Sequence, residues 1–338
     1  MDVEISFCVV NTSGRELLAR CLDAVRAQRA ELGVPSEVLV LDNGSDDGSA
    51  ESVAARGEDI ELIALRERRS KAVNDSELMA RSRGRYCLLL NEDSELLPGA
   101  AAALRNALED DPQAACAVAT LRRPDGRQQA SAWRFPTVAT ALAGALMLGR
   151  QASVQSTGAS VRHIDWGQSC ALAVRRAAAE AVGWMDPAYF VYGEEVDFQK
   201  RLADAGWHSL YVPSAVAIHH EQLSTGALPR RRIVENARGR ELYMQTHGGR
   251  LAAAAVRVLT AWTYTLRAAA ALVLPRHDSR RYLAHAAAAL WPARGEGLRE
   301  AAAEYNALRR AAAGGEDAVG ERADAGELGA VEEADRPQ

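Results

Sequence analysis

The sequence predicts an α/β protein with a mostly parallel sheet flanked by helices, followed by a helical C-terminal extension. In the first hundred residues, short apolar runs alternate with stretches of helical periodicity. Strands that alternate with helices form parallel βαβ units, whose sheet is covered by helices on both faces. Beyond Gly226 the sequence is rich in alanine and arginine and predicts almost continuous helix. We therefore expect one large α/β domain with an appendage, which a chain of 338 residues can accommodate.

The elements of the N-terminal part follow in strict alternation. Apolar runs predict strands at residues 5–10, 37–42, 60–65 and 85–90. Apolar positions at helical spacing predict helices at 15–29, 48–56 and 73–83. Ligands of parallel sheets bind at the carboxyl ends of the strands. Those ends carry the sequences VVNTSG, LDNGSDDGS and LLNEDSE, so they offer carboxylates and amides to a ligand.

An irregular segment interrupts the second half of the predicted domain. Residues 122–165 contain prolines, glycines and many hydroxyl side chains, and we expect them to face the substrate. The elements predicted before it are a helix at 100–108 and a strand at 116–121. The elements predicted after it are a strand at 170–175, helices at 178–183 and 194–205, and a strand at 209–220.

The net charge is distributed unevenly along the chain. The formal net charge is −5, yet residues 314–338 alone carry eight acidic residues and two arginines. The body is therefore close to neutral, and the acidic tail is predicted to be disordered. The arginines of the body are scattered rather than clustered, which argues against a nucleic-acid partner.

The cysteines and the N-terminus indicate a cytosolic protein. The five cysteines are odd in number, widely separated and free of any CxxC pair, so we expect reduced core thiols rather than disulfides or a zinc site. The sequence MDVEISFCVV runs directly into a predicted strand without a basic region or a cleavage site, and predicts no secretory signal.

LLLNEDSE is the strongest local signal of a site, because a strand leaves the core and ends in Asn91, Glu92 and Asp93. An Asx-x-Asp pair at a strand end suits a hard divalent cation that is already chelated by a diphosphate and needs few protein ligands. An ordinary acidic turn explains the same residues.

Asp42 ends the second predicted strand, within LDNGSDDGS. Its carboxylate can accept a hydrogen bond from a nucleobase or ribose, and the helix start that follows offers amide donors to phosphate. Capping of that helix is a sufficient explanation for Ser45, Asp46 and Asp47.

Three acids, Glu194, Glu195 and Asp197, open the helix predicted at 194–205. Negative charge at a helix N-terminus is stabilising in itself, which explains their position structurally. However, Glu194 and Asp197 share one helix face while Glu195 points elsewhere, and aromatic residues including Tyr192 precede them. A carboxylate in such partly dry surroundings can act as a general base.

The sequence AIHHEQLST ends the last predicted strand and presents His219 and His220. A histidine pair by itself is more often structural than catalytic. Combined with the Asx-x-Asp pair, one of the two histidines would complete a metal shell.

Residues 251–274 form an apolar stretch with two charges, long enough to span a bilayer. Arg257, Thr260, Tyr264 and Arg267 recur along one side at helical spacing. This pattern favours an amphipathic helix packed on the domain, on a second subunit or on a membrane surface. Full insertion into the bilayer is the remaining alternative.

Taken together, these motifs resemble the GT-A-fold, family 2 inverting glycosyltransferases, and within them the bacterial rhamnosyltransferase-like branch. The resemblance covers about residues 3–247 and rests on six segments in order. They are ISFCVVNTS, VLVLDNGSDDGS, GRYCLLLNEDSELLPGA, DGR followed by WRFP, DWGQSCALAVRR, and VGWMDPAYFVYGEEVDFQKRLADAGWHSLYVPSAVAIHHEQLST. The domains it implies are a glycosyltransferase domain at 1–226, a helical extension at 227–313 and an acidic disordered tail at 314–338.

The resemblance implies transfer of a sugar from a dTDP-, UDP- or GDP-sugar to an acceptor hydroxyl, in polysaccharide, glycolipid or natural-product glycosylation. Asp93 is expected to bind a divalent metal, Mn²⁺ or Mg²⁺, and His219 to join the metal and the diphosphate. Asn91 is expected to contact the ribose or a bound water. The other residues expected at the donor nucleotide are Val10, Asn11, Asp42, Asn74 and Arg68.

On the acceptor side, the resemblance implies that Glu195 is the catalytic base, with Glu194 beside it and Asp197 as a supporting acid. Trp166 and Tyr192 are expected to contact the acceptor, which is a glycan, a lipid-linked sugar or a small molecule. In a single inverting displacement, one carboxylate removes the acceptor proton while the metal neutralises the departing diphosphate.

Two departures from the family pattern keep a second hypothesis open. Residues 66–74 read RERRSKAVN, so Arg66, Arg68 and Arg69 replace the family's Asn, Gly and Phe and can pair with a diphosphate. Glu195 stands where aspartate is typical. The second hypothesis is a non-catalytic relative that binds sugar nucleotides or scaffolds a glycan assembly complex. A dehydrogenase is excluded because no GxGxxG opens the first helix.

The expected location is the cytoplasm, with peripheral contact at the inner face of the membrane. A homodimer is a further expected association, because the stretch 251–274 could pack on a second subunit. No nucleic-acid partner is expected.

Overall fold

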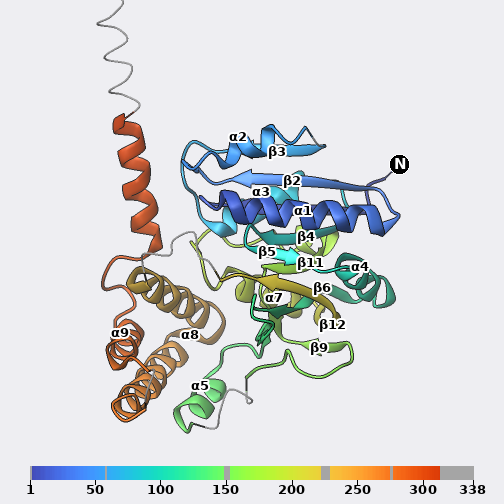
Figure 1. Ribbon diagram of the computed structural model, residues 1–338. Helices are drawn as coiled ribbons and strands as arrows, with labels where there is room; N and C mark the ends of the chain where they lie inside the picture. Colours follow the sequence, from blue (N-terminus) through green and yellow to red (C-terminus); the bar gives the residue numbers. More distant parts are fainter. Residues whose placement is uncertain (1, 58, 148–152, 222–228, 275–276, 313–338) are drawn as a thin grey trace, which may run out of the picture.

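The computed structural model describes residues 2–57, 59–147, 153–221, 229–274 and 277–312 (Figure 1). Among these residues, ten strands form the main sheet. They are β1 (Ile5–Asn11), β2 (Ser36–Asp42), β3 (Ile60–Ala64), β4 (Tyr86–Asn91), β5 (Ser94–Leu96), β6 (Ala114–Arg122), β7 (Gln128–Gln129), β9 (Arg162–Ile164), β11 (Ala171–Arg175) and β12 (His208–His219). The order is β3-β2-β1-β4-β11-β6-β12-β5, with β7 beside β6 and β9 beside β12. A separate ribbon pairs β8 (Ala132–Trp133) with β10 (Trp166–Gly167).

The strand directions bring the polar strand ends to one edge of the sheet. β1, β2, β3 and β4 are parallel. β11 is antiparallel to both β4 and β6, so β6 runs in the direction of β4, and β12 runs parallel to β6. Asn11 pairs with Asp42, and Val10 pairs with Asn91. Asn11, Asp42 and Asn91 therefore lie on neighbouring strands at the carboxyl edge, where open α/β sheets bind their ligands.

Helices cover both faces of this sheet. One face carries α1 (Arg15–Leu32), α2 (Ser49–Ala54) and α4 (Ala100–Asp110), and the other carries α3 (Lys71–Arg81), α6 (Arg176–Ala181) and α7 (Glu194–Asp204). In β1, Phe7 and Val9 pack on the α1 side, while Cys8 and Val10 pack on the α3 side. All of β1 is buried, which explains its continuous apolar sequence. The five cysteines are free and buried, as predicted.

The helical extension folds back onto the domain. α8 (Pro229–Ala270) consists of two helical legs joined at Gly249, whose φ of 81° and ψ of 171° interrupt the helix. Tyr243 of the first leg and Val256 of the second enter the core on the α3 side of the sheet. α9 (Ser279–Leu290) packs on α8, and residues 298–312 form a last helix, red in Figure 1. No helix within the described ranges has the combined length and apolarity that crossing a bilayer requires.

The predicted α/β class with a helical extension is confirmed, but the segment 122–165 is more regular than expected. It contains α5 (Val138–Ala145), which opens with a capping box between Thr137 and Thr140 and packs on α8. Short helices depend on tertiary packing for most of their stability, so the local pattern understates this one. The predicted boundary at 226 and the predicted tail at 314–338 lie outside the described residues.

Replacing Gly239 by alanine is expected to disturb the contact between α8 and the turn before α7. A Cβ atom at Gly239 would lie 2.0 Å from the backbone carbonyl oxygen of Tyr192. We expect Gly239→Ala to lower the free energy of unfolding by about 1–3 kcal/mol, as overpacking substitutions do, measured by chemical denaturation. Gly144→Ala in α5 is the matched control, because its Cβ would meet nothing closer than 3.9 Å. Equal stability of the two variants would contradict the importance of this contact.

Candidate active site

Asp93 and His219 face each other at the carboxyl edge of the sheet. Asp93 follows β4, and the next residue, Ser94, pairs with His219 across β5 and β12. The Nε2 atom of His219 lies 3.3 Å from Oδ1 of Asp93, and both residues are buried. Among the described residues, this oxygen accepts no hydrogen bond.

The second ring nitrogen of His219 indicates what the pair can hold. Nδ1 lies 3.1 Å from the amide oxygen of Gln129, which can only accept, so this contact orients the ring with Nε2 toward Asp93. In the neutral tautomer that carries its proton on Nδ1, Nε2 offers a lone pair beside Oδ1 of Asp93. This donor set fits a divalent cation, with Gln129 as the partner that orients the histidine.

Asp42 organises the loop after β2. Its Oδ1 accepts hydrogen bonds from Nδ2 of Asn11 at 2.7 Å and from the Ser45 hydroxyl at 2.6 Å, and its Oδ2 accepts from the Ser45 amide at 3.0 Å. The prediction that Ser45 and Asp46 cap α2 is wrong, because the cap position is Gly48 and Asp46 accepts from Ser13 instead. Asp47, the third residue of that prediction, does accept from the amide of Ser49, the first residue of α2, at 3.1 Å. The Ser45 hydroxyl is instead held by the strand ends. Val10, which precedes Asn11 on β1, is buried.

Asn74 is a completely buried residue of α3 whose side-chain amide has no hydrogen-bond partner among the described residues. Leaving a buried amide unpaired is costly, so such groups mark positions where a ligand or water is expected. α3 packs on β1 and β2, which places Asn74 on an element beside the Asp42 loop.

The turn before α7 positions two glutamates. Tyr192 and Gly193 both have positive φ, 69° and 101°, and Gly193 begins α7. The Gly193 amide donates to Oε2 of Glu195 at 3.3 Å. A non-glycine residue in this conformation is strained and is retained mainly where the geometry is functional. Glu194 is 2% exposed, and its Oε2 has no partner in the described part of the chain.

The half-buried Lys71 balances these acids. Burial raises the pKa of Glu195, and burial together with the neighbouring Glu195 charge raises the pKa of Glu194 well above its ordinary value. The ammonium group of Lys71 opposes both shifts and also bonds to Asp75 at 2.6 Å. Burial lowers the pKa of Lys71, but Asp75 and Glu194 raise it more, so it stays charged. The Gly193 amide also donates to Glu195, which favours the ionised form of this carboxylate, as a base requires.

Asp197 serves a different purpose in the structure. It is 1% exposed, and its two oxygens accept from Arg201 at 2.7 Å and from the ring of His247 at 2.8 Å. His247 belongs to the first leg of α8, so this carboxylate ties α7 to the extension. Asp197 does not line the cavity that contains Glu195.

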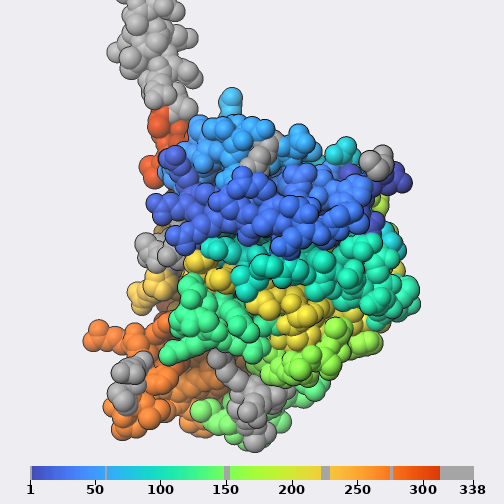
Figure 2. Space-filling model, turned by 45° about the vertical axis from the view of Figure 1, so that its right-hand side comes forward, coloured from blue at the N-terminus to red at the C-terminus, as the bar shows by residue number. Residues whose placement is uncertain are grey.

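A cavity of about 690 Å³ leads from Glu195 into the helical extension. Trp133 and Trp166 stack at 4.8 Å on its wall, and Tyr192 lies beside Glu195. Its far end is formed by α5, α8 and α9. In the space-filling view, green residues of the middle segment lie next to the orange C-terminal helices, below the blue N-terminal part (Figure 2). Stacked aromatic rings and a recessed carboxylate suit a sugar acceptor.

Comparison with known proteins agrees with this geometry. A family model described as Glycosyl transferase family 2 matches residues 6–167. The chain is 31% identical over 241 residues to N-acetylglucosaminyl-diphospho-decaprenol L-rhamnosyltransferase of Mycobacterium tuberculosis, covering 64% of this chain and 76% of the relative. The chain belongs to glycosyl transferase family 2. It is a glycosyltransferase, and its similarity is to the rhamnosyltransferase-like members.

Two solved structures share the GT-A fold of this glycosyltransferase at low identity. GalNAc-T7, crystallised with UDP, GalNAc and Mn²⁺, aligns with a TM-score of 0.54 at 15% identity, over 85% of this chain and 54% of its own. S. aureus TarS aligns with a TM-score of 0.51 at 10% identity, over 81% of this chain and 46% of its own. The glycosyltransferase thus spans about half the length of each, and the likeness concerns the fold alone.

The sequence did not reveal that the last helix of the glycosyltransferase packs on the loop after β2 and on Arg68, a residue predicted to bind the donor. The Tyr305 hydroxyl donates to the carbonyl of Gly44 at 2.9 Å, and the Asn306 side chain bonds both to the amide and to the carbonyl of Arg68. The Arg68 guanidinium lies 3.5 Å from the Tyr305 ring centroid and donates to Ser13. These partners are more than 200 positions apart, so no local pattern connects them.

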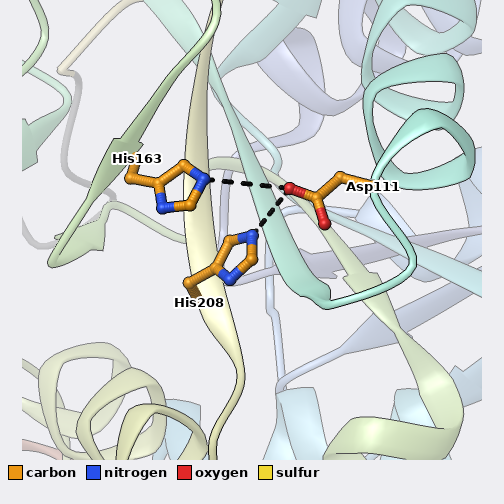
Figure 3. Close-up of side chains that lie close together, drawn as sticks. All are labelled: Asp111, His163 and His208. Carbon is orange, nitrogen blue, oxygen red and sulfur yellow. Dashed lines mark hydrogen bonds and ion pairs between the residues drawn. The ribbon is translucent and has the colours of Figure 1, made fainter.

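A second group of ligand-type side chains lies elsewhere in the glycosyltransferase (Figure 3). Oδ2 of Asp111 is 2.7 Å from Nε2 of His208 and 3.9 Å from Nε2 of His163, and the two rings stack at 4.0 Å. His208 begins β12, and Asp111 precedes β6, so the group sits at the amino edge of the sheet, opposite to Asp93 and the donor side. It is separate from the predicted metal pair.

Proposed function

We propose that this glycosyltransferase moves a sugar from a nucleotide-diphosphate donor to an acceptor hydroxyl by a single displacement that inverts the anomeric centre. The observation that supports this proposal is the separation of roles in space. Asp93 and His219 converge at the strand ends, and Glu195 stands on another element at the head of a cavity. An inverting transfer needs one base on the acceptor side and cation ligands on the diphosphate side.

In the proposed reaction, Glu195 accepts the proton of the acceptor hydroxyl while the hydroxyl oxygen attacks the anomeric carbon. The bond from that carbon to the diphosphate breaks, and the nucleoside diphosphate leaves with the electron pair. A divalent cation, Mn²⁺ or Mg²⁺, held by Asp93 and His219 would neutralise the departing charge. Residues proposed to bind the donor nucleotide are Val10, Asn11, Asp42, Asn74, Asn91 and Arg68.

We further propose that the donor carries rhamnose and that the acceptor is a sugar joined to a lipid through a diphosphate. The support is the similarity to a relative whose name states both the rhamnosyl transfer and the diphospho-decaprenol acceptor. The Trp133–Trp166 stack beside Glu195 offers a platform for the acceptor sugar. Tyr192 stands at the same end of the cavity and is proposed to contact the acceptor.

The extension is proposed to touch the membrane surface from which such an acceptor would come. α5, α9 and the second leg of α8 contain no acidic residue, α9 and that leg of α8 also contain arginines, and the three lie together at the lower end of Figure 1. Basic, partly apolar surfaces attract anionic bilayers. The large apolar side chains exposed on and beside these helices include Leu142, Leu146, Met147, Val258, Trp262, Leu272, Val273 and Leu283.

Sedimentation with lipid vesicles checks the proposed membrane contact. We expect the glycosyltransferase to sediment with vesicles of phosphatidylglycerol and phosphatidylcholine, and the double variant Leu146→Glu/Trp262→Glu to remain largely in the supernatant. Val161→Glu, at an exposed valine next to β9, is the control and should sediment normally. Equal sedimentation of all three proteins would contradict the proposal, as would a dimer in the absence of lipid that the double variant dissociates.

Replacing the proposed base, or a residue of the proposed metal-binding pair Asp93 and His219, is expected to slow transfer strongly. Glu195→Gln should lower turnover by about 10²–10⁴-fold, because the acceptor proton then has no base, while donor binding is retained. Asp93→Ala should lower turnover and abolish its dependence on Mn²⁺. Release of nucleoside diphosphate, with and without Mn²⁺ and EDTA, measures both effects. Asp204→Asn, an exposed acid of α7, is the control, and normal turnover by the first two variants would refute these assignments.

The pH dependence of transfer is expected to follow the raised pKa of Glu195. Because burial raises the pKa of Glu195, kcat/KM should fall with decreasing pH at a value above the ordinary glutamate range. Lys71 lowers that pKa, so the acidic limb of Lys71→Met should move to higher pH. Lys200→Met changes the other lysine of the chain, on the exposed side of α7, and should leave the limb in place. A limb that stays in place or moves to lower pH in Lys71→Met would contradict this electrostatic role.

A further inference from the structure

Five arginines line the cavity that contains Glu195. They are Arg134, Arg232, Arg240, Arg267 and Arg281. Of the described residues around this cavity, Glu195 is the sole carboxylate. The cavity is therefore strongly positive, although the body of the chain is close to neutral.

These arginines differ from their neighbours in lacking acidic partners. Within the described part of the chain, none of the five forms an ion pair with a carboxylate. The nearby residues that are paired include Arg231 with Glu304, Arg238 with Glu300, and Arg257 with Glu241. Unpaired guanidinium groups that share a cavity repel one another, and an anionic ligand would relieve that repulsion.

Three of the five share the wall of the cavity with His285. His285 of α9 lies in the cavity wall and stacks on Tyr264 at 4.5 Å. Burial, followed by the charges of Arg281, Arg240 and Arg267, lowers the pKa of His285 to about 4. The three guanidinium charges therefore act on one neutral imidazole, and all four side chains line the same cavity. They come from the first leg of α8, the last turn of α8 and α9, so only the folded extension brings them together.

The position of this group separates it from the donor side. Asp42, Asp93 and His219 do not line the cavity, so the arginines are not placed for the diphosphate of the donor. Arg240 is half buried, while Arg267 and Arg281 are exposed, on helices that also expose the apolar side chains of Trp262 and Leu283. An anion bound here would have its sugar side toward Glu195 and its lipid side toward the exposed apolar side chains of α8 and α9.

We propose that Arg240, Arg267 and Arg281 form the subsite for the diphosphate of the acceptor. This proposal rests on the proposed function, because it assumes that the acceptor enters the cavity of Glu195. Guanidinium groups bind phosphate oxygens through two parallel hydrogen bonds, which fixes both the position and the direction of the ligand. The subsite would hold the acceptor sugar against the Trp133–Trp166 stack while its hydroxyl meets the base.

Transfer to two matched acceptors tests the subsite. One acceptor is a sugar joined through a diphosphate to a short lipid chain, and the other is the same sugar as a simple alkyl glycoside. For Arg240→Gln, Arg267→Gln and Arg281→Gln we expect the KM of the diphosphate acceptor to rise about tenfold or more, as loss of a charge-assisted hydrogen bond implies. The KM of the alkyl glycoside and of the donor should stay unchanged. Arg250→Gln, in the same helix but outside the cavity, is the control.

A binding measurement keeps the test independent of catalysis. In calorimetry with EDTA present, inorganic pyrophosphate should bind the unmodified glycosyltransferase and should not bind the triple arginine variant. This readout remains decisive even if the protein transfers no rhamnose, so failure of the subsite and failure of the proposed function are distinguishable. Equal losses with both acceptors would overturn the subsite, as would unchanged KM values. A loss of vesicle binding without a change in KM would assign the arginines to lipid headgroups and would also overturn it.

Discussion

Two glutamates at the start of α7 lie close to a lysine at the start of α3, and the proposed acceptor side of the molecule depends on the balance of their charges. Burying carboxylates without a partner is costly, so Glu194 and Glu195 need the ammonium group of Lys71 nearby. Lys71 also donates its backbone amide to the carbonyl of Phe190 at 2.8 Å, which holds the turn that precedes α7. One residue of α3 thereby affects both the charge and the position of the proposed base.

The helical extension forms the part of the candidate site that the sheet does not supply. The sheet edge alone supplies the Asp42 network and the Asp93–His219 pair, both of which belong to the proposed donor side. α8 closes the other side by lying directly against Tyr192, a contact so close that Gly239 has no room for a Cβ atom. Its first leg is tied to α7 through His247 and Asp197. The helix α8 bends at Gly249, and residues from both of its legs line the cavity that contains Glu195.

The last helix packs on residues of the proposed donor side, including Arg68. The substituted segment at 66–74 suggested arginines that pair with a diphosphate, and the structure shows a second use for one of them. Arg68 is covered by the ring of Tyr305, and its backbone is held by Asn306. A cationic side chain fixed in this way is preorganised, because its rotamer is set before any anion binds. The departure from the family pattern at Arg68 is thus matched by a helix that packs on it.

The sequence by itself determined the sheet, its polar carboxyl edge and the family, because apolar periodicity and short motifs are local properties of the chain. Asp42, Asn91 and Asp93 could be recognised in this way, since each directly ends or follows a strand. The tertiary structure alone decided which side chains share a site. The unpaired arginines of α8 and α9, the Tyr305 contact and the balance between Lys71 and Glu195 all join residues far apart in sequence. Their charges and burial arise only when the helices pack, so no local pattern carries that information.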